Sequence, residues 1–328
     1  MSIPPPPPSF HGMFDGRSAS GSASRDGFDL IPPVPGQFSS SAPPYVPYPL
    51  PPHVKLTDVL MDLYKPSSAE FGICRISIDR PLRKNAFRPE TVEDLIKAFR
   101  LAEDDPEIGC IVLQGKGKDF CAGGDQSVRG DGGYQHEQTE VPPRLKVLDL
   151  HVQMKRCPKP IMAVVKGYAV GGGHILHMVC DITLCDSTAV FGQTGPRMGS
   201  FDAGYGCSRM ARLVGQKKAR ELWFLAKFYN AEEAADMGLV NKVVRDGGQW
   251  GVDYEAIKWA RRMMGNSPSA LACLKAALNA DEDGAAGMMQ LAGNATRLYY
   301  LTEEAKEGRE AFLAKRPPYW RKIPSSKL

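Results

Sequence analysis

The sequence predicts an α/β fold in which short apolar strands alternate with amphipathic helices. A strand pattern at Gly72 to Asp79, a helical spacing of apolar residues from Val92 to Phe99 and a second strand at Cys110 to Leu113 follow one another as in a β-α-β unit. Two predicted strands lead directly into glycine-rich turns. The chain after Asp253 is nearly all helical in pattern.

Composition limits the function classes. The 328 residues are 43% hydrophobic and carry a net charge of +4, which allows a large core and gives no electrostatic footprint for nucleic acid. No apolar run reaches the ~18 residues of a membrane span, and the N-terminus lacks a secretory pattern. The eight cysteines show no CxxC pair. We therefore expect buried, reduced thiols and no metal site. Cys121 lies near the suspected site, but no His/Asn pair is visible to activate it.

Four segments are expected along the chain. Residues 1–53 form a disordered Pro/Ser/Gly-rich leader, either a targeting peptide or a linker, because they hold 14 of the 27 prolines and no hydrophobic periodicity. The folded part begins near Val54, and residues 54–260 form the core. Residues 261–320 form a C-terminal helical segment, and 321–328 an exposed tail.

Within the core and the helical segment, hydrophobic periodicity and glycine positions predict the remaining elements. Strands are expected at Ile161 to Val165, Ile182 to Leu184, Ala189 to Phe191 and Leu239 to Val244, and helices at Leu145 to Met154, after Gly173, at Ser208 to Leu225, Ala231 to Met237, Tyr254 to Met264, Pro268 to Asn279 and Gly287 to Ala314.

The two glycine turns carry the first functional signal. Gly171, Gly172 and Gly173 stand between an apolar run and a helical segment, and Gly123 and Gly124 follow an earlier strand. Free backbone N–H groups at two such turns, side by side, can hold a developing oxyanion. The alternative for either turn is a packing role only.

At these residues the chain resembles the crotonase superfamily, which binds acyl-CoA thioesters, over roughly Ile73 to Arg316. The resemblance implies a spiral core of repeated β-β-α units, a trimer or hexamer, and Gly124 and Gly172 as the two N–H donors to the thioester oxygen. Hydratases of the superfamily carry two glutamates where this chain has Ile175 and Gly195. Hydration is therefore unsupported.

Four motifs, at residues 127–134, 191–196, 199–202 and 293–300, resemble the 1,4-dihydroxy-2-naphthoyl-CoA synthase family of phylloquinone and menaquinone biosynthesis. This implies an intramolecular Claisen condensation of 2-succinylbenzoyl-CoA. Ser200, Asp202, Tyr134 and Tyr300 would surround the aryl carboxyl group, with Asp202 holding or relaying a proton. The alternatives are another crotonase lyase acting on an aryl-acyl-CoA, or a crotonase scaffold without catalysis.

The resemblance also assigns coenzyme A contacts. Lys84 would lie near the phosphates and Lys315 would reach a neighbouring subunit's CoA, while Ser127 stands where many relatives carry lysine. The remaining expected substrate contacts are Ala122, Gly123, Asp125, Gln126, Arg129, Tyr168, Ala169, Val170, Gly171 and Thr194.

The catalytic base is the last inference at the site. The Gln193-Thr194-Gly195 turn offers no carboxylate, and in the branch of synthases that it resembles a bound hydrogencarbonate serves instead, held by this turn and by a tryptophan corresponding to Trp223. The alternatives are that Gly195 only permits a turn, or that Asp202 is the base.

The final tripeptide, Ser326-Lys327-Leu328, has the form read by the peroxisomal import receptor. We therefore expect a peroxisomal enzyme, with a plastid location as the alternative because of the Ser-rich leader.

Overall fold

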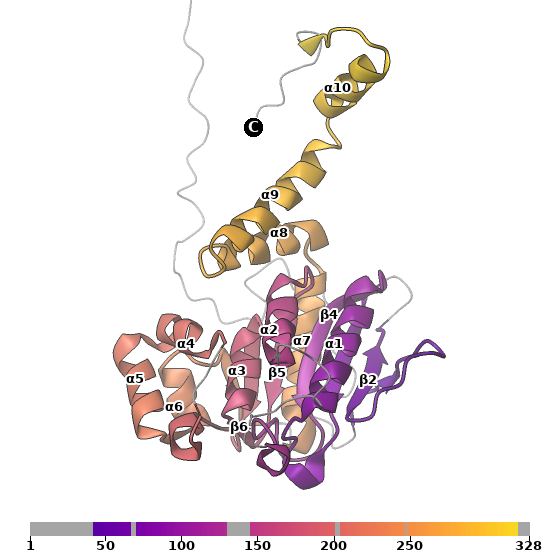
Figure 1. The fold of residues 1–328 in the computed structure, drawn as a ribbon. Helices are drawn as coiled ribbons and strands as arrows, with labels where there is room; N and C mark the ends of the chain where they lie inside the picture. Colours follow the sequence, from indigo (N-terminus) through magenta and orange to yellow (C-terminus); the bar gives the residue numbers. More distant parts are fainter. Residues whose placement is uncertain (1–41, 67–69, 130–144, 201–203, 247, 321–328) are drawn as a thin grey trace, which may run out of the picture. The chain divides into compact units, whose positions relative to one another are not determined.

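The computed structural model describes residues 42–66, 70–129, 145–200, 204–246 and 248–320 (Figure 1). It confirms the predicted α/β fold. The strands are β1 (Val46–Pro47), β2 (Val59–Tyr64), β3 (Gly72–Ile78), β4 (Ile108–Gly115), β5 (Ile161–Val165), β6 (Tyr168–Val170), β7 (Ile182–Asp186), β8 (Val190–Gly192), β9 (Phe228–Asn230) and β10 (Lys242–Val244). The helices are α1 (Pro89–Asp104), α2 (Lys146–Arg156), α3 (Gly172–Val179), α4 (Gly206–Val214), α5 (Gln216–Leu225), α6 (Ala231–Asp236), α7 (Gly251–Met264), α8 (Pro268–Asn279), α9 (Ala285–Tyr299) and α10 (Glu303–Leu313), with 3₁₀ turns η1 (Pro81–Arg83), η2 (Gln126–Val128), η3 (Gly195–Met198) and η4 (Gly248–Trp250).

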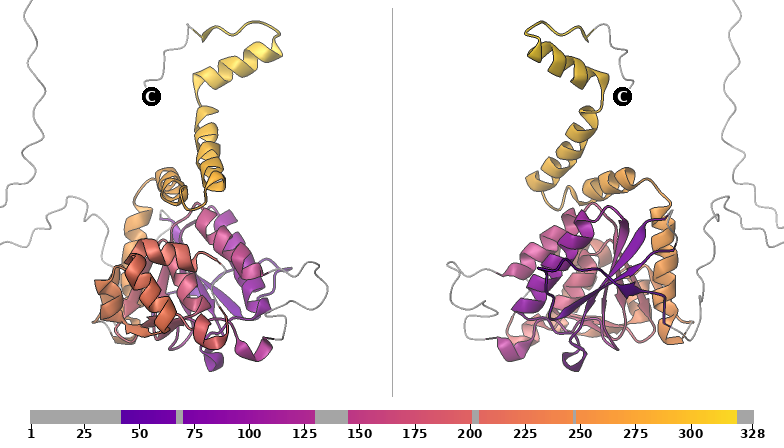
Figure 2. Two further views of the ribbon diagram at one scale, coloured as in Figure 1. Left: turned by 60° about the vertical axis from the view of Figure 1, so that its left-hand side comes forward. Right: turned by 90° about the vertical axis from the view of Figure 1, so that its right-hand side faces the viewer.

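The main sheet has the order β1-β2-β3-β4-β5-β7-β10. β1, β2 and β3 pair antiparallel, and β3 through β10 pair parallel. Its central strands are buried on both faces, so they read as continuous apolar runs rather than alternating ones. Helices α1, α2 and α3 cover one face and α7 covers the other (Figures 1 and 2).

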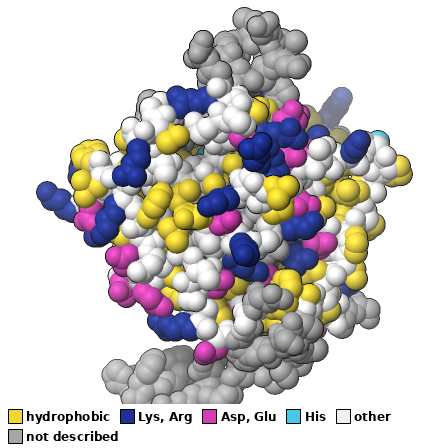
Figure 3. All heavy atoms as spheres, turned by 90° about the horizontal axis from the view of Figure 1, so that it is seen from below, with side chains coloured by type: hydrophobic (Ala, Val, Ile, Leu, Met, Phe, Trp, Pro, Cys, Tyr) yellow, Lys and Arg dark blue, Asp and Glu magenta, His cyan; other side chains and the backbone are white. Residues whose placement is uncertain are grey.

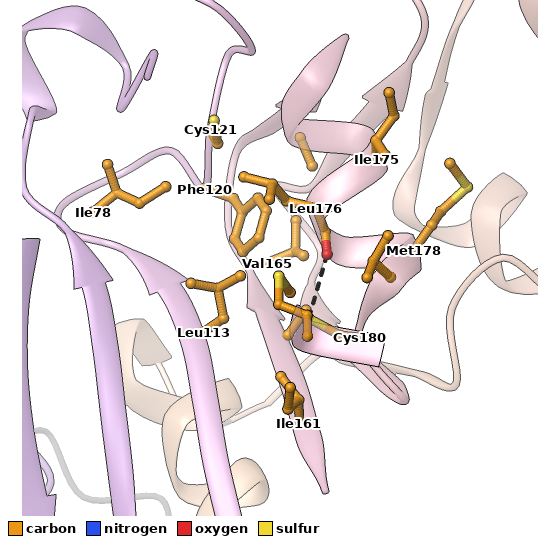
Figure 4. Packing of buried hydrophobic residues seen from close by; sticks show 14 of the residues in the cluster. Ile78, Leu113, Phe120, Cys121, Ile161, Val165, Ile175, Leu176, Met178 and Cys180 are labelled. Carbon is orange, nitrogen blue, oxygen red and sulfur yellow. Dashed lines mark hydrogen bonds between the residues drawn. The ribbon is translucent and has the colours of Figure 1, made fainter. Parts of the chain in front are cut away.

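A second, three-stranded sheet, β6-β8-β9, stands beside the first. β6 leads into α3 at Gly171, and α3 packs through Leu176 and Val179 into the same apolar cluster as Phe120 and Val165 (Figure 4). This packing fixes the N-terminal end of α3 next to the chain at Cys121. The glycine turns are thereby brought to one place.

Two helix predictions were wrong in extent. The helix expected over Ser208 to Leu225 is two helices, α4 and α5, separated by Gly215 with φ of 78°. The helix expected over Gly287 to Ala314 ends at Tyr299, and α10 starts after Thr302, whose side chain accepts a hydrogen bond from the Ala305 N–H. In both cases a terminating or capping residue lies inside one continuous helical pattern.

The fold includes residues before Val54, where the sequence predicts the folded part to begin. β1 pairs with β2, Tyr48 donates to Asp105 at 2.9 Å, and the Arg75 guanidinium lies 3.9 Å from the Tyr45 ring centre. Residues 42–53 therefore belong to the fold although they are proline-rich. The leader prediction for residues 1–41 and the tail prediction for 321–328 lie outside the described residues.

A buried ion-pair cluster holds the turn between α8 and α9 against the core. Lys155 of α2, 1% exposed, lies 2.6 Å from Glu282 and 3.1 Å from Asp283. Arg209 of α4 also contacts Glu282, at 2.9 Å, and the Tyr205 hydroxyl donates to Asp283 at 2.7 Å. Beyond this anchor, α9, α10 and the turn between them expose several large apolar side chains: Met288, Met289, Leu298, Leu301, Phe312 and Leu313.

The eight cysteines differ in exposure. Six of the eight are buried, as expected, whereas Cys207 is exposed and Cys273 is half-buried. Among the described residues, no helix is long and apolar enough to cross a membrane.

Candidate functional site

Backbone hydrogen bonds join the two glycine turns side by side. The Cys121 N–H donates to the Tyr168 carbonyl at 2.8 Å, and the Val170 N–H donates to the Cys121 carbonyl at 3.1 Å. An added Cβ on Gly123 would lie 3.1 Å from the Gly172 nitrogen. Because Gly123 has a φ of 87°, the turn needs glycine for its conformation as well as for this close approach.

Two N–H groups remain available at this junction. The Phe87 N–H donates to the Gly123 carbonyl and the Asp125 N–H donates to the Phe87 carbonyl, both at 2.8 Å. The N–H of Gly124 takes no part in this pair of hydrogen bonds. Gly172 is the first residue of α3 and has no partner for its N–H within that helix. Within the described part of the chain, neither N–H is recorded with an acceptor.

These turns open into a cavity of about 340 Å³. Apolar side chains make most of its wall, and the remaining lining is glycine, amide, hydroxyl, imidazole and indole. Its lining residues are Phe87, Ala122, Gly123, Gly124, Gln126, Leu145, Val147, Leu148, His151, Gly171, Gly172, Ile175, Gln193, Thr194, Gly195, Met198, Ser200 and Trp223. No Asp or Glu is among these described lining residues.

Two donors in the cavity lining lack acceptors among the described residues. The Gln193 amide nitrogen Nε2 and the Trp223 indole nitrogen Nε1 are buried, and neither has a hydrogen-bond partner in the part of the chain described. Gln193 is held in place because the N–H of its neighbour, Gly192, donates to His174 Nδ1 at 3.1 Å. A buried unpaired donor costs about 1–3 kcal/mol. Both donors line the cavity together with Gly195, which has no side chain, so a small anion bound there could accept hydrogen bonds from them.

The sequence predicts two site positions without a carboxylate, and both lie in the cavity lining. Ile175 of α3 and Gly195 both line it, and neither side chain can transfer a proton. Asp125, close in sequence, is instead buried against Arg80 at 2.9 Å and accepts from Ser127. Burial alone would raise the pKa of Asp125, but the bonds from Ser127 and Arg80 outweigh it and hold that pKa below its usual value. Asp125 is therefore a structural anion.

The catalytic residues expected from the sequence are only partly brought together. Ser200 lines the cavity, and its N–H donates to the Gly195 carbonyl at 2.8 Å. Asp202 and Tyr134 lie outside the described residues. Tyr300 does not line the cavity of its own chain: it is exposed, between α9 and α10, beside a separate hollow with Trp320.

Several expected coenzyme A residues also take other places. Ala122, Gly123, Gln126, Gly171 and Thr194 line the cavity, whereas Ala169 and Val170 are buried in β6. Arg129 donates to the carbonyls of Met198 and Gly199, each at 2.8 Å, and so ties η2 to η3. Lys315 is exposed just beyond α10.

Lys84 is available for an anion. Its Nζ lies 4.1 Å from the centre of the Tyr168 ring, and its side chain is exposed. On the face seen from below, lysine and arginine side chains are interspersed with apolar and acidic ones (Figure 3). That face therefore shows no continuous basic block (Figure 3).

Sequence reasoning missed six lining residues: Phe87, Leu145, Val147, Leu148, His151 and Met198. The signal for His151 was its position three residues after Leu148, which places both on one side of a helix. Cys121 is fully buried, and burial raises the pKa of its thiol to about 12, so it is no nucleophile.

The family model and the similar solved structures agree in their description. The family model described as enoyl-CoA hydratase/isomerase matches residues 68–323. An enoyl-CoA hydratase subunit I from Geobacillus kaustophilus is 28% identical with a TM-score of 0.61, covering 81% of this chain and 98% of that one. An enoyl-CoA hydratase from Bacillus anthracis is 26% identical with a TM-score of 0.62, covering 80% and 98%. An enoyl-CoA hydratase/carnitine racemase from Magnetospirillum magneticum is 26% identical with a TM-score of 0.60, covering 79% and 94%.

Proposed function

The chain belongs to the enoyl-CoA hydratase/isomerase family, and we propose that within it the protein is a 1,4-dihydroxy-2-naphthoyl-CoA synthase acting on 2-succinylbenzoyl-CoA. One observation carries the proposal: the cavity has no carboxylate at Ile175 or Gly195, and it has two buried donors, Gln193 and Trp223, without acceptors. A hydratase needs acids there. An enzyme that uses a bound anion as its base needs donors.

The first task of the site is to stabilise an enolate. The N–H groups of Gly124 and Gly172 would both donate to the thioester oxygen, which becomes negatively charged when the α-proton leaves. Removing one donor of this kind costs roughly 2.7–4 kcal/mol in transition-state stabilisation. Because both donors belong to backbone fixed by the Cys121 and Val170 hydrogen bonds, they require no reorganisation during the reaction.

The second task is to hold the base. Gln193 Nε2 and Trp223 Nε1 are neutral donors, so they would orient an anion without lowering its basicity as a full positive charge would. Gly195 leaves the space, and its carbonyl is occupied by the Ser200 N–H. When bound there, hydrogencarbonate would supply the base for the α-proton.

The third task is to present the electrophile. The enolate carbon attacks the aryl carboxyl carbon, which forms the new carbon–carbon bond, closes the ring and releases water. Ser200 lines the cavity and can donate to that carboxyl group. We assign Asp202, Tyr134 and a neighbouring subunit's Tyr300 to the same region on the strength of the motif resemblance.

The test is the conversion of 2-succinylbenzoyl-CoA by the purified full-length protein, followed by the absorbance of the naphthoate product. Turnover should fall in buffer stripped of carbon dioxide and return when hydrogencarbonate is added. No spectral change in either buffer would reject the synthase assignment. Full activity in the stripped buffer would reject the anion as base and return that role to Asp202 or another protein group.

A further inference from the structure

His151 is a polar side chain that the proposed reaction does not use. It lies on α2, is 2% exposed and lines the cavity with Leu148 and Ile175. Both ring nitrogens are buried, and neither Nδ1 nor Nε2 has a hydrogen-bond partner in the described chain. A buried imidazole whose two nitrogens have lost their hydrogen bonds to water without gaining others is unfavourable. Its position therefore calls for a hydrogen-bond partner that the described residues do not supply.

The surroundings of the ring preserve this arrangement. Gly204 leaves room for it: a Cβ at that residue would lie 3.0 Å from His151 Nδ1 and 3.1 Å from Leu148 Cδ2. Burial lowers the pKa of His151 to about 4, and no charged group contributes to the shift. At neutral pH the ring is therefore an uncharged group with one N–H donor and one acceptor nitrogen. Such a ring is a weak base and a good neutral donor.

We propose that His151 is a specificity-determining residue that donates a hydrogen bond to an oxygen on the aryl part of the bound acyl group. This rests on the proposed function, in which the thioester oxygen is held at Gly124 and Gly172 and the base at Gln193 and Trp223. The oxygens left for His151 are those of the aryl carboxyl group and the aryl ketone. Its position beside Gly204, four residues after Ser200 in the sequence, favours the carboxyl oxygen.

Three unreactive ligands separate these possibilities: 2-naphthoyl-CoA, 1-hydroxy-2-naphthoyl-CoA and 4-hydroxy-2-naphthoyl-CoA. The 1-hydroxyl stands where the aryl carboxyl oxygen ends in the product, and the 4-hydroxyl where the ketone oxygen ends. Dissociation constants are measured by calorimetry for the wild-type protein and for His151→Leu and His151→Gln. We expect the wild-type protein to bind the 1-hydroxy ligand about tenfold tighter than 2-naphthoyl-CoA, equivalent to about 1.4 kcal/mol.

The leucine variant should reduce that ratio to about one without weakening 2-naphthoyl-CoA, and the glutamine variant, which keeps a donor and an acceptor, should restore most of it. His177→Leu is the matched control. His177 is also a buried histidine with an unpaired Nε2, but it does not line the cavity, so its replacement should leave the ratio unchanged even if it lowers stability.

A ratio that survives in His151→Leu, or a wild-type protein that binds all three ligands equally or none, would overturn the proposal. A preference for the 4-hydroxy ligand that His151→Leu abolishes would support it with the ketone oxygen as partner. A wild-type protein that shows the preference but does not convert 2-succinylbenzoyl-CoA would reject the proposed function and leave the role of His151 in place.

Discussion

Neither Ile175 nor Gly195 has a side chain that can transfer a proton, and this limits the chemistry of the cavity. An isoleucine and a glycine at the cavity wall remove both proton carriers expected of a hydratase, while Gln193 and Trp223 add buried donors. Under the proposed function, we expect the charge needed to remove a proton to come from a bound species. Single substitutions at these residues should therefore change the requirement for that species as well as the rate.

Gly195→Asp tests this directly. The new carboxylate would stand within reach of Gln193 and Trp223 and accept their hydrogen bonds, so it should provide part of the base function. We expect a turnover below that of the wild-type protein and independent of added hydrogencarbonate. Gly195→Asn, which has the same size without the charge, is the control and should be nearly inactive in both buffers. An aspartate variant that still needs hydrogencarbonate would contradict the assignment.

Gly172→Pro tests the oxyanion donors. Proline removes the N–H at the first position of α3, where its backbone conformation is otherwise tolerated, although its ring must displace Phe87, which lies 2.6 Å from an added Cβ. Turnover should fall by ~100-fold or more. Gly172→Ala keeps the N–H and meets the same Phe87 ring, so it separates the steric effect from the lost donor. Equal losses in a folded pair that still binds acyl-CoA would remove Gly172 from the mechanism.

At the scale of elements, the sequence predicted what local patterns encode. β5 and α8 have the predicted bounds because an uninterrupted apolar run and a Ser267 cap followed by Pro268 mark them unambiguously. β1, β2 and β9 were not predicted. β1 and β9 have only two and three residues, which gives them no periodicity of their own, and they exist through pairing with β2 and β8. His151 was missed because its isolation depends on Gly204, far from it in sequence.

Gly215→Ala examines the break between α4 and α5. Gly215 has φ of 78° and ψ of 158°, and an added Cβ would meet no atom within 4 Å, so only backbone strain opposes alanine. We expect a loss of about 1–3 kcal/mol in unfolding free energy, measured as a lower Tm by scanning calorimetry. Gly293→Ala within α9 is equally free of contacts and helical, and should not lower the Tm. A Gly215 variant as stable as the wild-type protein would show that the break is not enforced by this residue.

At the scale of the whole molecule, two expected site residues lie on the C-terminal helical segment and do not line the cavity. Tyr300 and Lys315 belong to a segment whose apolar side chains are exposed in the single chain. Several large apolar side chains exposed on one helical segment are typical of an interface. We therefore expect a homo-oligomer, a trimer or hexamer, in which α9 and α10 pack against a neighbouring copy.

The double variant Leu301→Glu/Phe312→Glu should dissociate this oligomer. Both side chains are large and more than 75% exposed, and burying two carboxylates in an apolar interface is unfavourable. Sedimentation velocity should show smaller species, and turnover should fall with them. Leu82→Glu is the control, because Leu82 is 99% exposed on η1, away from these helices in sequence. A variant with wild-type sedimentation would place the interface elsewhere.

The location of the protein is testable through its last three residues. A fluorescent protein joined to the N-terminus leaves Ser326-Lys327-Leu328 free, and we expect it to accumulate in peroxisomes. Deleting the tripeptide should release it to the cytosol. Plastid accumulation of a version tagged at the C-terminus, with the leader free, would instead assign targeting to residues 1–53.

The distribution of the thiols gives the molecule a natural attachment point for a spectroscopic probe. Six cysteines are enclosed, and burial raises the pKa of those at 74, 110, 121, 157, 180 and 185. Maleimide reagents react with accessible thiolates, so Cys207 should be labelled first. It lies three residues after Gly204, at the start of α4. A dye attached there would report ligand entry near His151 by fluorescence, with no engineered residue.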